Sequence, residues 1–193
     1  TASSRGLSLA HLSRMVTGQL HGRIAAGGML GLGARGEVSL RVDDLGIAGW
    51  RLGPTTLSTR FVDGVASIEA GAPGLELHAV IDTSGTTSVD GLLQNAIIYR
   101  ENGRDSIRLT GRFRGVAPIG HVASGAMQVE LDSARAEFSG WKMNLPEGVA
   151  AEYTDGEARL TTTRMVTPLG TVHLGGVLAS DHLDFAARID SFD

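Results

Sequence analysis

Apolar and polar residues alternate along most of this chain, and this pattern restricts its fold more than any other feature. The segment EVSLRV places Val38, Leu40 and Val42 on one face and their polar neighbours on the other. The segments LELHAVI, SIRLTGRF, MQVEL, TVHLGGVL and LDFAARI alternate in the same way. A period of two residues is typical of strands with one apolar and one solvated face, so the sequence predicts an all-β chain of about 14 strands.

Dipeptides that favour turns separate these strands. Asp and Asn tolerate a positive φ, and glycine adopts it at no steric cost, so both suit tight hairpins. We therefore expect an antiparallel meander with turns at Asp63-Gly64, Pro73-Gly74, Asp90-Gly91, Asn102-Gly103 and Asp155-Gly156.

One or two short helices are expected beside the strands. In Leu7–Val16 the residues Leu9, Leu12 and Met15 recur at helical spacing, and Gly18 follows as a stop signal. Val89–Ala96 is a second, weaker helical candidate.

Three landmarks occur twice in the same order, which indicates an internal repeat. The phrases TGQLHG, GWRL and FVDG return as TGRFRG, GWKM and YTDG, at offsets of 93, 91 and 92 residues. Self-similarity at a fixed period is typical of repeat architectures. We predict two units, residues 7–98 and 99–193. The alternative to a repeat is that these landmarks recur because Gly and Asp-Gly are common in the turns of any meander.

Two architectures fit such a meander. The sheet folds upon itself into a sandwich or barrel with a filled core, or it curls along its length and leaves an apolar channel. Repeats that add length favour the second, an elongated solenoid-like sheet.

Composition excludes several classes of protein. The 193 residues carry a net charge of −4, and Lys and Arg do not cluster, so nucleic acid is not an expected partner. The chain has no Cys, which excludes a disulfide framework or a thiolate metal site. No apolar run is long enough for a transmembrane helix. Because the chain starts at Thr1 rather than Met, we expect a piece of a longer protein.

Motifs for catalysis or metal binding are weak. GLGARG at Gly31–Gly36 fits G-x-G-x-x-G, but an alternating strand follows it, where a dinucleotide site needs a helix. The six histidines show neither H-x-H nor H-E-x-x-H spacing. The only adjacent Asp pair, Asp43-Asp44, is expected to end a strand. We predict no enzyme, no metal and no cofactor; a carboxylate pair, as in β-helical polysaccharide enzymes, is the remaining catalytic alternative.

The two tryptophans, Trp50 and Trp141, occupy matching places after a glycine. They would act as repeated packing anchors or as amphipathic rings that touch lipid at a groove rim. Packing is the favoured alternative, because a residue that recurs in each unit is explained by the needs of that unit.

Several features together resemble the TamB family (translocation and assembly module) of Gram-negative envelope proteins, and more loosely the AsmA-like group. They are the Leu-rich run into LAHLSRMVTGQLHG, the Gly-Trp-Arg/Lys turn, the hairpins FVDGVASI and YTDGEARL, and TPLGTVHLGGVL at Thr167–Leu178. These segments cover most of the chain, and their order and repetition carry the resemblance. The first copy departs from the pattern near Ser84–Arg104.

The resemblance implies a β-taco, a long bent sheet with an apolar interior and a lengthwise opening. It also implies a periplasmic segment of a protein that is anchored in the inner membrane by a helix outside this segment. The expected partners are phospholipid and an outer-membrane barrel protein of the TamA type. The implied function is transport of phospholipid between the membranes in support of outer-membrane biogenesis, without catalytic residues.

The apolar residues of the alternating strands are the expected lining of the lipid groove. They are Val38, Leu40, Val42, Leu57, Phe61, Leu75, Leu77, Ile107, Leu109, Phe113, Met127, Val129, Leu131, Leu160, Val172 and Leu174. The alternative function is a β-solenoid scaffold or interaction surface that assists outer-membrane protein assembly or adhesion, in which an open edge pairs with a client strand.

Overall fold

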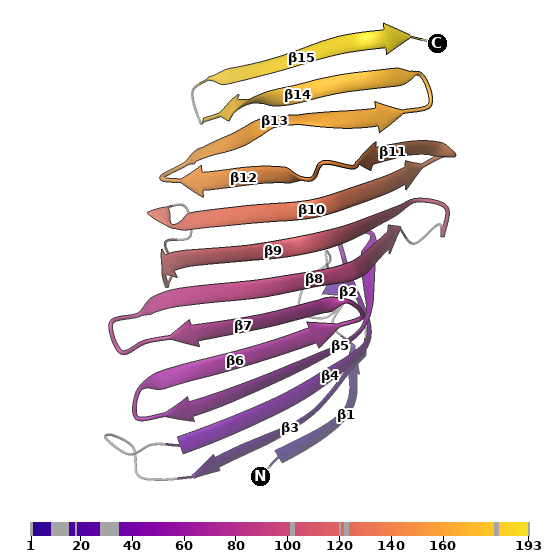
Figure 1. Cartoon of the computed structure of the whole chain (residues 1–193). Coiled ribbons are helices and arrows are strands. Elements are labelled where there is room, and N and C mark those ends of the chain that lie inside the picture. Colours follow the sequence, from indigo (N-terminus) through magenta and orange to yellow (C-terminus); the bar gives the residue numbers. More distant parts are fainter. Residues whose placement is uncertain are drawn as a thin grey trace.

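The chain forms one continuous antiparallel sheet (Figure 1). The computed structural model describes residues 2–8, 16–17, 19–27, 35–100, 103–119, 121, 124–179 and 182–192, and these contain strands but no helix. The 15 strands are β1 (Ala2–Ser8), β2 (Val16–Thr17), β3 (Gln19–Gly27), β4 (Arg35–Ile47), β5 (Trp50–Val62), β6 (Val65–Ala72), β7 (Leu75–Ile81), β8 (Thr86–Arg100), β9 (Ser106–Pro118), β10 (Ala126–Phe138), β11 (Trp141–Leu145), β12 (Val149–Thr154), β13 (Glu157–Thr167), β14 (Gly170–Leu178) and β15 (Leu183–Phe192). The all-β prediction is confirmed.

Strand order follows chain order with few exceptions. The main path runs β1-β3-β4-β5-β6-β7-β8-β9-β10-β11-β13-β14-β15. β12 continues the line of β11 and also pairs with β10 and β13, while β2 pairs with the end of β4. Beyond the end of the β6–β7 hairpin, β5 pairs directly with β8 through Trp50 and Arg51. The sheet is therefore two strands narrower at that end.

The predicted helix at Val89–Ala96 is wrong, because these residues lie within β8. Leu93 pairs with Gly111 and Ala96 with Leu109, so β8 holds one more residue than β9 over this stretch. The extra residue is accommodated as a β-bulge with Asn95 at φ 53°. Because of the bulge, Leu93 and Ala96 lie on the same face of the sheet although they are three residues apart. In the sequence this spacing resembles that of a helix.

The first helical candidate, Leu7–Val16, lies mostly outside the described residues. Leu7 and Ser8 belong to β1 and Val16 belongs to β2, whereas residues 9–15 are not described.

Most of the predicted turns are confirmed, and two match closely in geometry. Asp63 and Gly64 have φ 52° and 86°, and Asp155 and Gly156 have φ 50° and 86°, as type I′ hairpins require. Pro73-Gly74 also forms a turn, and Asn102 lies outside the described residues.

The predicted turn at Asp90-Gly91 is wrong. Both residues lie in the middle of β8, and Gly91 pairs with Phe113 of β9. A Cβ atom at Gly91 would lie 2.0 Å from Cζ of Phe113, so the aromatic ring occupies the space that a side chain would need. The glycine is therefore required by cross-strand packing.

Both tryptophans begin a strand after an equivalent turn. Trp50 follows Ala48 and Gly49 at φ 52° and 82°, and Trp141 follows Ser139 and Gly140 at φ 50° and 85°. The two Gly-Trp landmarks therefore have the same local structure, a turn followed by the start of a strand. The division of the chain into units 7–98 and 99–193 stays a prediction.

A line of irregularities, which we call the crease, crosses the sheet from β4 to β13. The register shifts after Val42, Leu93, Leu131 and Leu160. On the same line the β6–β7 hairpin ends at Pro73-Gly74, and residues 146–148 separate β11 from β12. Bulges bend strands and increase their twist. Their alignment divides the longer strands into two limbs that meet at the crease.

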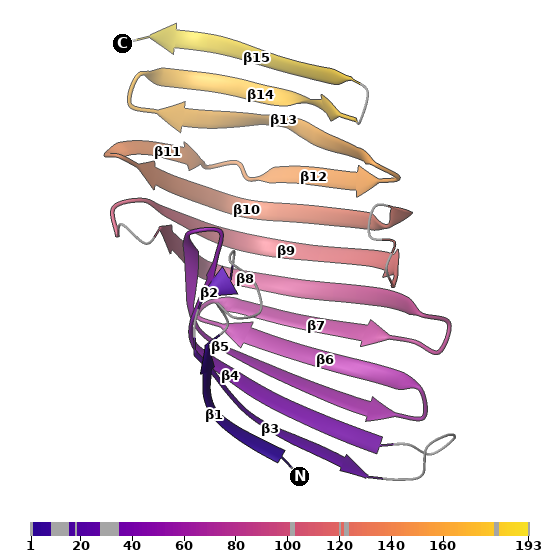
Figure 2. The same cartoon turned by 180° about the vertical axis from the view of Figure 1, so that it is seen from behind.

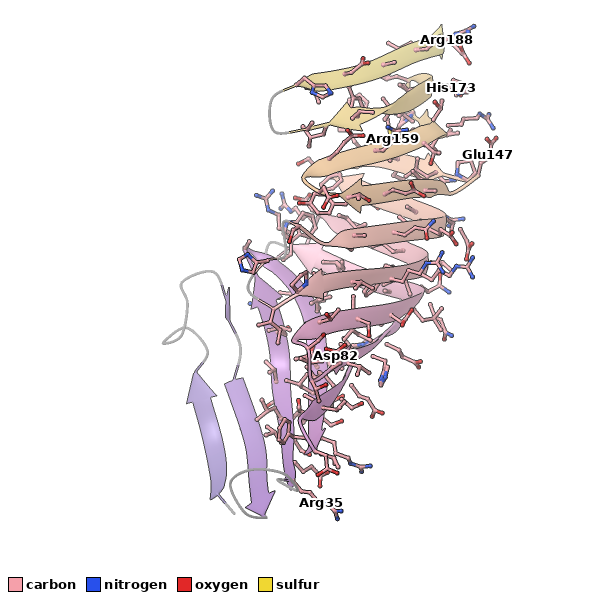
Figure 3. The ribbon with its side chains drawn as sticks, turned by 90° about the vertical axis from the view of Figure 1, so that its left-hand side faces the viewer. Arg35, Asp82, Glu147, Arg159, His173 and Arg188 are labelled. Carbon is pink, nitrogen blue, oxygen red and sulfur yellow. The ribbon has the colours of Figure 1, made fainter. Side chains whose placement is uncertain are left out.

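The sheet curls at its N-terminal end. The ends of β4 and β5 near β2 bend behind the plane of the later strands in Figure 1 and stand in front of it in Figure 2. In profile, Glu147, His173 and Arg188 lie on one side of the sheet, and the N-terminal strands turn toward the other (Figure 3). The curl is thus directed away from the face that carries His173 and Arg188.

The core is thin, because all described strands belong to one sheet. The apolar residues buried below a tenth of their surface are Val42, Ala79, Leu93, Ala96 and Ala134, and no large described side chain is fully buried. Most apolar contacts are therefore lateral, between side chains of neighbouring strands on the same face. No helix of the described residues has the length and apolar character needed to cross a membrane.

Candidate functional site

One face of the sheet, here called the apolar face, carries an unbroken row of apolar residues. Directly paired residues of antiparallel strands project to the same side. The row runs through Leu40, Leu57, Ala70, Leu77, Gly91, Phe113, Val129, Ala151, Leu160, Gly176 and Phe185, from β4 to β15. Its members are small or aliphatic except for the two phenylalanines.

The register places all of the predicted groove residues on this apolar face. Val38, Phe61 and Met127 belong to rows on one side of the central row. Val42, Leu75 and Leu131 belong to the row on its other side. Leu109 and Ile107 lie beyond the crease on β9, and Val172 and Leu174 lie on β14. That they line a lipid groove stays a prediction.

Sequence reasoning missed the residues that follow the bulges. Ala96 and Ile98 on β8, and Ala134 and Ala136 on β10, share the apolar face because they pair with Leu109 and Ile107 of β9. Strict alternation from Leu93 or Leu131 assigns them to the opposite face. The available signal was the polar pair Gln94-Asn95 between two apolar pairs.

Trp50 extends the apolar face beyond the crease. Its ring meets that of Phe138 edge-on, with centroids 5.9 Å apart, although β8 and β9 separate their strands in the sheet order. Trp141, which pairs with Phe138 across the next hairpin, is 52% exposed. Trp50 is therefore a packing residue, whereas Trp141 presents its ring to solvent.

The opposite surface, here called the polar face, carries two rows of hydrophilic residues over β4–β10. One row contains Arg41, Thr56, Glu76, Arg112 and Glu130. The other contains Ser39, Ser58, Glu69, His78, Asp90, Arg114 and Gln128.

A groove with a volume of about 1200 Å³ lies between these two rows. Residues of both polar rows line it, together with Leu40, Leu57, Leu77 and Phe113 of the row between them. The rows on the outer sides of the apolar face are missing from its lining. The groove is therefore on the polar face, and the intervening apolar residues form its floor through their backbone.

Paired and unpaired charged side chains both line this groove. Arg112 forms an ion pair with Glu130, and Arg114 donates two hydrogen bonds to Oε1 of Gln128, at 2.8 and 2.6 Å. Gln128 in turn donates to Glu152 at 3.3 Å. No described residue forms a hydrogen bond or ion pair with the side chains of Glu69 or Asp90. No group of three or more His, Asp or Glu in the described part of the chain is arranged to hold a metal ion.

A His-Arg-Asp cluster occurs at both ends of the sheet. In the first, His21 Nε2 and Arg41 Nε contact the two oxygens of Asp43 at 3.1 and 3.3 Å. In the second, His173 Nε2 and Arg188 Nε contact the two oxygens of Asp190 at 2.7 and 2.9 Å.

Both clusters have the same layout. Each histidine pairs directly with the arginine, and the aspartate follows two residues later. The sequence signal is the recurrence of Arg-Val-Asp and Arg-Ile-Asp. Since these side chains are 34–84% exposed, each cluster is a cross-strand contact worth about 1 kcal/mol or less.

The turn between β7 and β8 contains a carboxyl whose pKa is lowered by hydrogen bonds. Oδ1 of Asp82 accepts hydrogen bonds from the Ser84 hydroxyl at 2.6 Å and from the Thr86 backbone N–H at 2.9 Å. These bonds, the Ser84 hydroxyl first, lower the pKa of Asp82 below its usual 3.8.

Comparison of the chain with protein-family models, curated proteins and solved structures finds no match.

Proposed function

We propose that this chain is a periplasmic segment of an inner-membrane-anchored protein that shields phospholipid acyl chains on its apolar face. Shielded in this way, lipid would pass between the inner and outer membranes. The observation that carries the proposal is the apolar row from Leu40 to Phe185, which crosses β4 to β15 while no second layer of described strands covers it. The anchor and an outer-membrane barrel partner of the TamA type are part of the proposal, and they rest on the resemblance.

Acyl chains require little specific chemistry from such a surface. Removing a methylene group from water contributes about 0.8 kcal/mol, so a continuous apolar lining is sufficient to hold a chain. Alanines at Ala70 and Ala151 stand between larger residues along the row, so the apolar face is uneven. The curl of the N-terminal strands toward this side supports a partly enclosed trough.

Photo-crosslinking distinguishes the two faces. A photoreactive amino acid would be placed at Leu40, Leu109 and Leu131 on the apolar face, and at Arg41, Arg108 and Glu130 as matched controls on the polar face. The full-length protein would be irradiated in cells, and adducts would be identified by mass spectrometry. Phospholipid adducts confined to the first set support the proposal. Equal labelling of both sets, or no lipid adducts, contradicts it.

Charge substitutions on the apolar face provide a functional test. Leu40→Asp and Leu131→Arg would put a charge where acyl chains are proposed to lie, so lipid transfer should fall more than stability does. Arg41→Asp, one residue away on the polar face, is the control for a new carboxylate. Unimpaired transfer in both apolar-face variants would refute the conduit.

The second candidate is a scaffold or interaction surface for outer-membrane protein assembly. It is favoured by the charged groove of about 1200 Å³ on the polar face, which a lipid conduit does not use. Protein adducts at Arg41, Arg108 and Glu130, without lipid adducts on the other face, would support this candidate.

A further inference from the structure

Two arginines, here called the arginine pair, face each other on the polar face beyond the crease. Arg108 of β9 pairs directly with Arg135 of β10, in the interior of the sheet. Directly opposite residues of antiparallel strands have Cβ atoms about 4.5–5.5 Å apart, and like charges in such positions are destabilising. Both arginines are exposed, and neither forms a side-chain hydrogen bond or ion pair with a described residue. Nothing in the described part of the chain therefore offsets their repulsion.

The same two strands provide partners for their other arginines. Arg112 of β9 forms an ion pair with Glu130 of β10, which lies directly opposite. Arg114, two residues earlier in the same ladder of pairs, donates two hydrogen bonds to Oε1 of Gln128. These arginines are satisfied across the strands, whereas the arginine pair is available to a bound anion.

Polar side chains that can donate hydrogen bonds surround the arginine pair. Asn144 of β11 pairs directly with Arg135 and extends the row to a third strand. Thr110 and Ser133, which pair with each other, lie on one side of this row, and Lys142 of β11 lies on the other side. Hydroxyl, amide and ammonium donors are thus arranged around two guanidinium groups.

Two carboxylates of β10 limit the positive charge of this surface. Glu137 pairs with Lys142 and lies two residues after Arg135, and Asp132 lies in the bulge at the crease. Neither forms an ion pair with the arginine pair. The positive charge is therefore confined to a small area, which favours a small anion over an extended polyanion such as nucleic acid.

The arrangement of donors selects among small anions. Each guanidinium can donate two parallel hydrogen bonds to the oxygens of one acceptor. A carboxylate has only two oxygens, which a single arginine can occupy, whereas a phosphate group has at least three acceptor oxygens and up to two negative charges. We infer that the pair of Arg108 and Arg135 binds a phosphate group on the polar face, with Asn144 and Lys142 as further donors.

This site lies on the face opposite to the one that is proposed to carry acyl chains, so the inference does not depend on that proposal. Inorganic phosphate and the phosphomonoester headgroup of phosphatidate present the same chemistry to the arginine pair. The experiments below separate these two sources.

Arginine-to-lysine substitutions test the site. Isothermal titration calorimetry at constant ionic strength would measure binding of inorganic phosphate to the whole chain and to its Arg108→Lys and Arg135→Lys variants. Each change keeps the charge but removes the planar fork of donors, so it should weaken phosphate binding by at least about fivefold. Arg112→Lys, on the same strand and face but paired with Glu130, is the matched control and should alter the affinity by about twofold or less.

A charge reversal tests the repulsion within the arginine pair. In the absence of phosphate, Arg135→Glu should raise the Tm of the chain, because an attractive cross-strand pair replaces a repulsive one. Phosphate should raise the Tm of the unmodified chain, since a ligand that binds the folded state stabilises it. The Tm of Arg135→Glu should not respond to phosphate.

Vesicle flotation identifies the source of the phosphate group. Vesicles of phosphatidylcholine with phosphatidate, and vesicles of phosphatidylcholine alone, would be mixed with the unmodified chain and with Arg108→Lys. Flotation that increases with phosphatidate, and loses this increase in the variant, assigns the site to a lipid headgroup. Binding of inorganic phosphate without such an increase assigns it to a soluble phosphate group.

Four results would overturn the inference. The first is the absence of saturable binding of inorganic phosphate in the millimolar range. The second is unchanged affinity in both Arg108→Lys and Arg135→Lys. The third is equal weakening by Arg112→Lys, which would indicate a diffuse electrostatic effect. The fourth is a phosphate-dependent rise in Tm that persists in Arg135→Glu.

Discussion

The ring of Phe113 on β9 lies over Gly91 on β8, so closely that a Cβ atom on the glycine would be 2.0 Å from Cζ of the ring. The contact lies in the central row of the apolar face. Gly91→Ala should destabilise the sheet by about 1–3 kcal/mol, because the ring must move out of its position. Urea denaturation followed by circular dichroism would measure this change.

Gly71→Ala is the matched control, because a Cβ atom there would have its nearest contact at 3.4 Å. It should change stability by about 0.5 kcal/mol or less. Combining Gly91→Ala with Phe113→Leu should recover part of the loss. Equal destabilisation by the two glycine variants would contradict the packing argument.

The crease depends on a second glycine. Gly148, between β11 and β12, has φ +72°, and a Cβ atom there would lie 2.1 Å from the carbonyl oxygen of Leu131. Gly148→Ala should cost about 2–4 kcal/mol, since backbone strain and a backbone clash both oppose it. Thermal unfolding would measure the loss.

Gly156→Ala is the control that separates the cost of backbone strain from the cost of the steric clash at Gly148. Gly156 has φ +86°, but a Cβ atom there would have no other atom within 4 Å. Only the backbone strain should therefore destabilise this variant, by about 1 kcal/mol. Similar losses for the two variants would argue against a tight contact at the crease.

Trp50 and Phe138 connect strands that are not neighbours, with ring centroids 5.9 Å apart. A double-mutant cycle with Trp50→Ala and Phe138→Ala should give a coupling energy of about 0.5–1.5 kcal/mol. As a control, Trp50→Ala and Phe61→Ala should be additive, because no ring contact joins those residues. A coupling energy near zero for Trp50 and Phe138 would show that the curl does not depend on this contact.

Asp82 should make the β7–β8 turn sensitive to acid. Its pKa is below the usual 3.8, first because of the Ser84 hydroxyl and then the Thr86 N–H, so the folded state favours the ionised form. The stabilisation is fully present above pH 3.8 and is lost as the pH falls through the lowered pKa. Hydrogen exchange of the Ser84 and Thr86 amides should accelerate over that range, relative to distant amides. Asp82→Asn should remove this pH dependence of amide exchange. If the variant kept the same dependence on pH, the role of the Asp82 carboxylate would be refuted.

Strand identity and the choice of face were predictable from the sequence because both are local properties. The period of two in EVSLRV or LDFAARI assigns each side chain to a face without knowledge of its neighbours. Turns at Asp63-Gly64 and Asp155-Gly156 were equally predictable, since they depend on the φ of two residues. All of the residues proposed for the groove share one face for the same reason.

Features that depend on the neighbouring strand escaped prediction. Asp90-Gly91 has the composition of a turn, but the ring of Phe113 keeps it within a strand. Val89–Ala96 has the spacing of a short helix, but a β-bulge opposite Thr110 produces it. In both cases the deciding group belongs to β9, which lies about 20 residues away in the sequence and is adjacent only in the folded sheet.

The sequence by itself thus determined an all-β chain with one apolar and one polar face, because alternation acts residue by residue. Only the tertiary structure decided where the bulges align into a crease, that a groove of about 1200 Å³ lies on the polar face, and that Trp50 reaches Phe138. These properties arise from the register between strands and from the curvature of the whole sheet. Both are set by the sum of many cross-strand contacts that no single segment encodes.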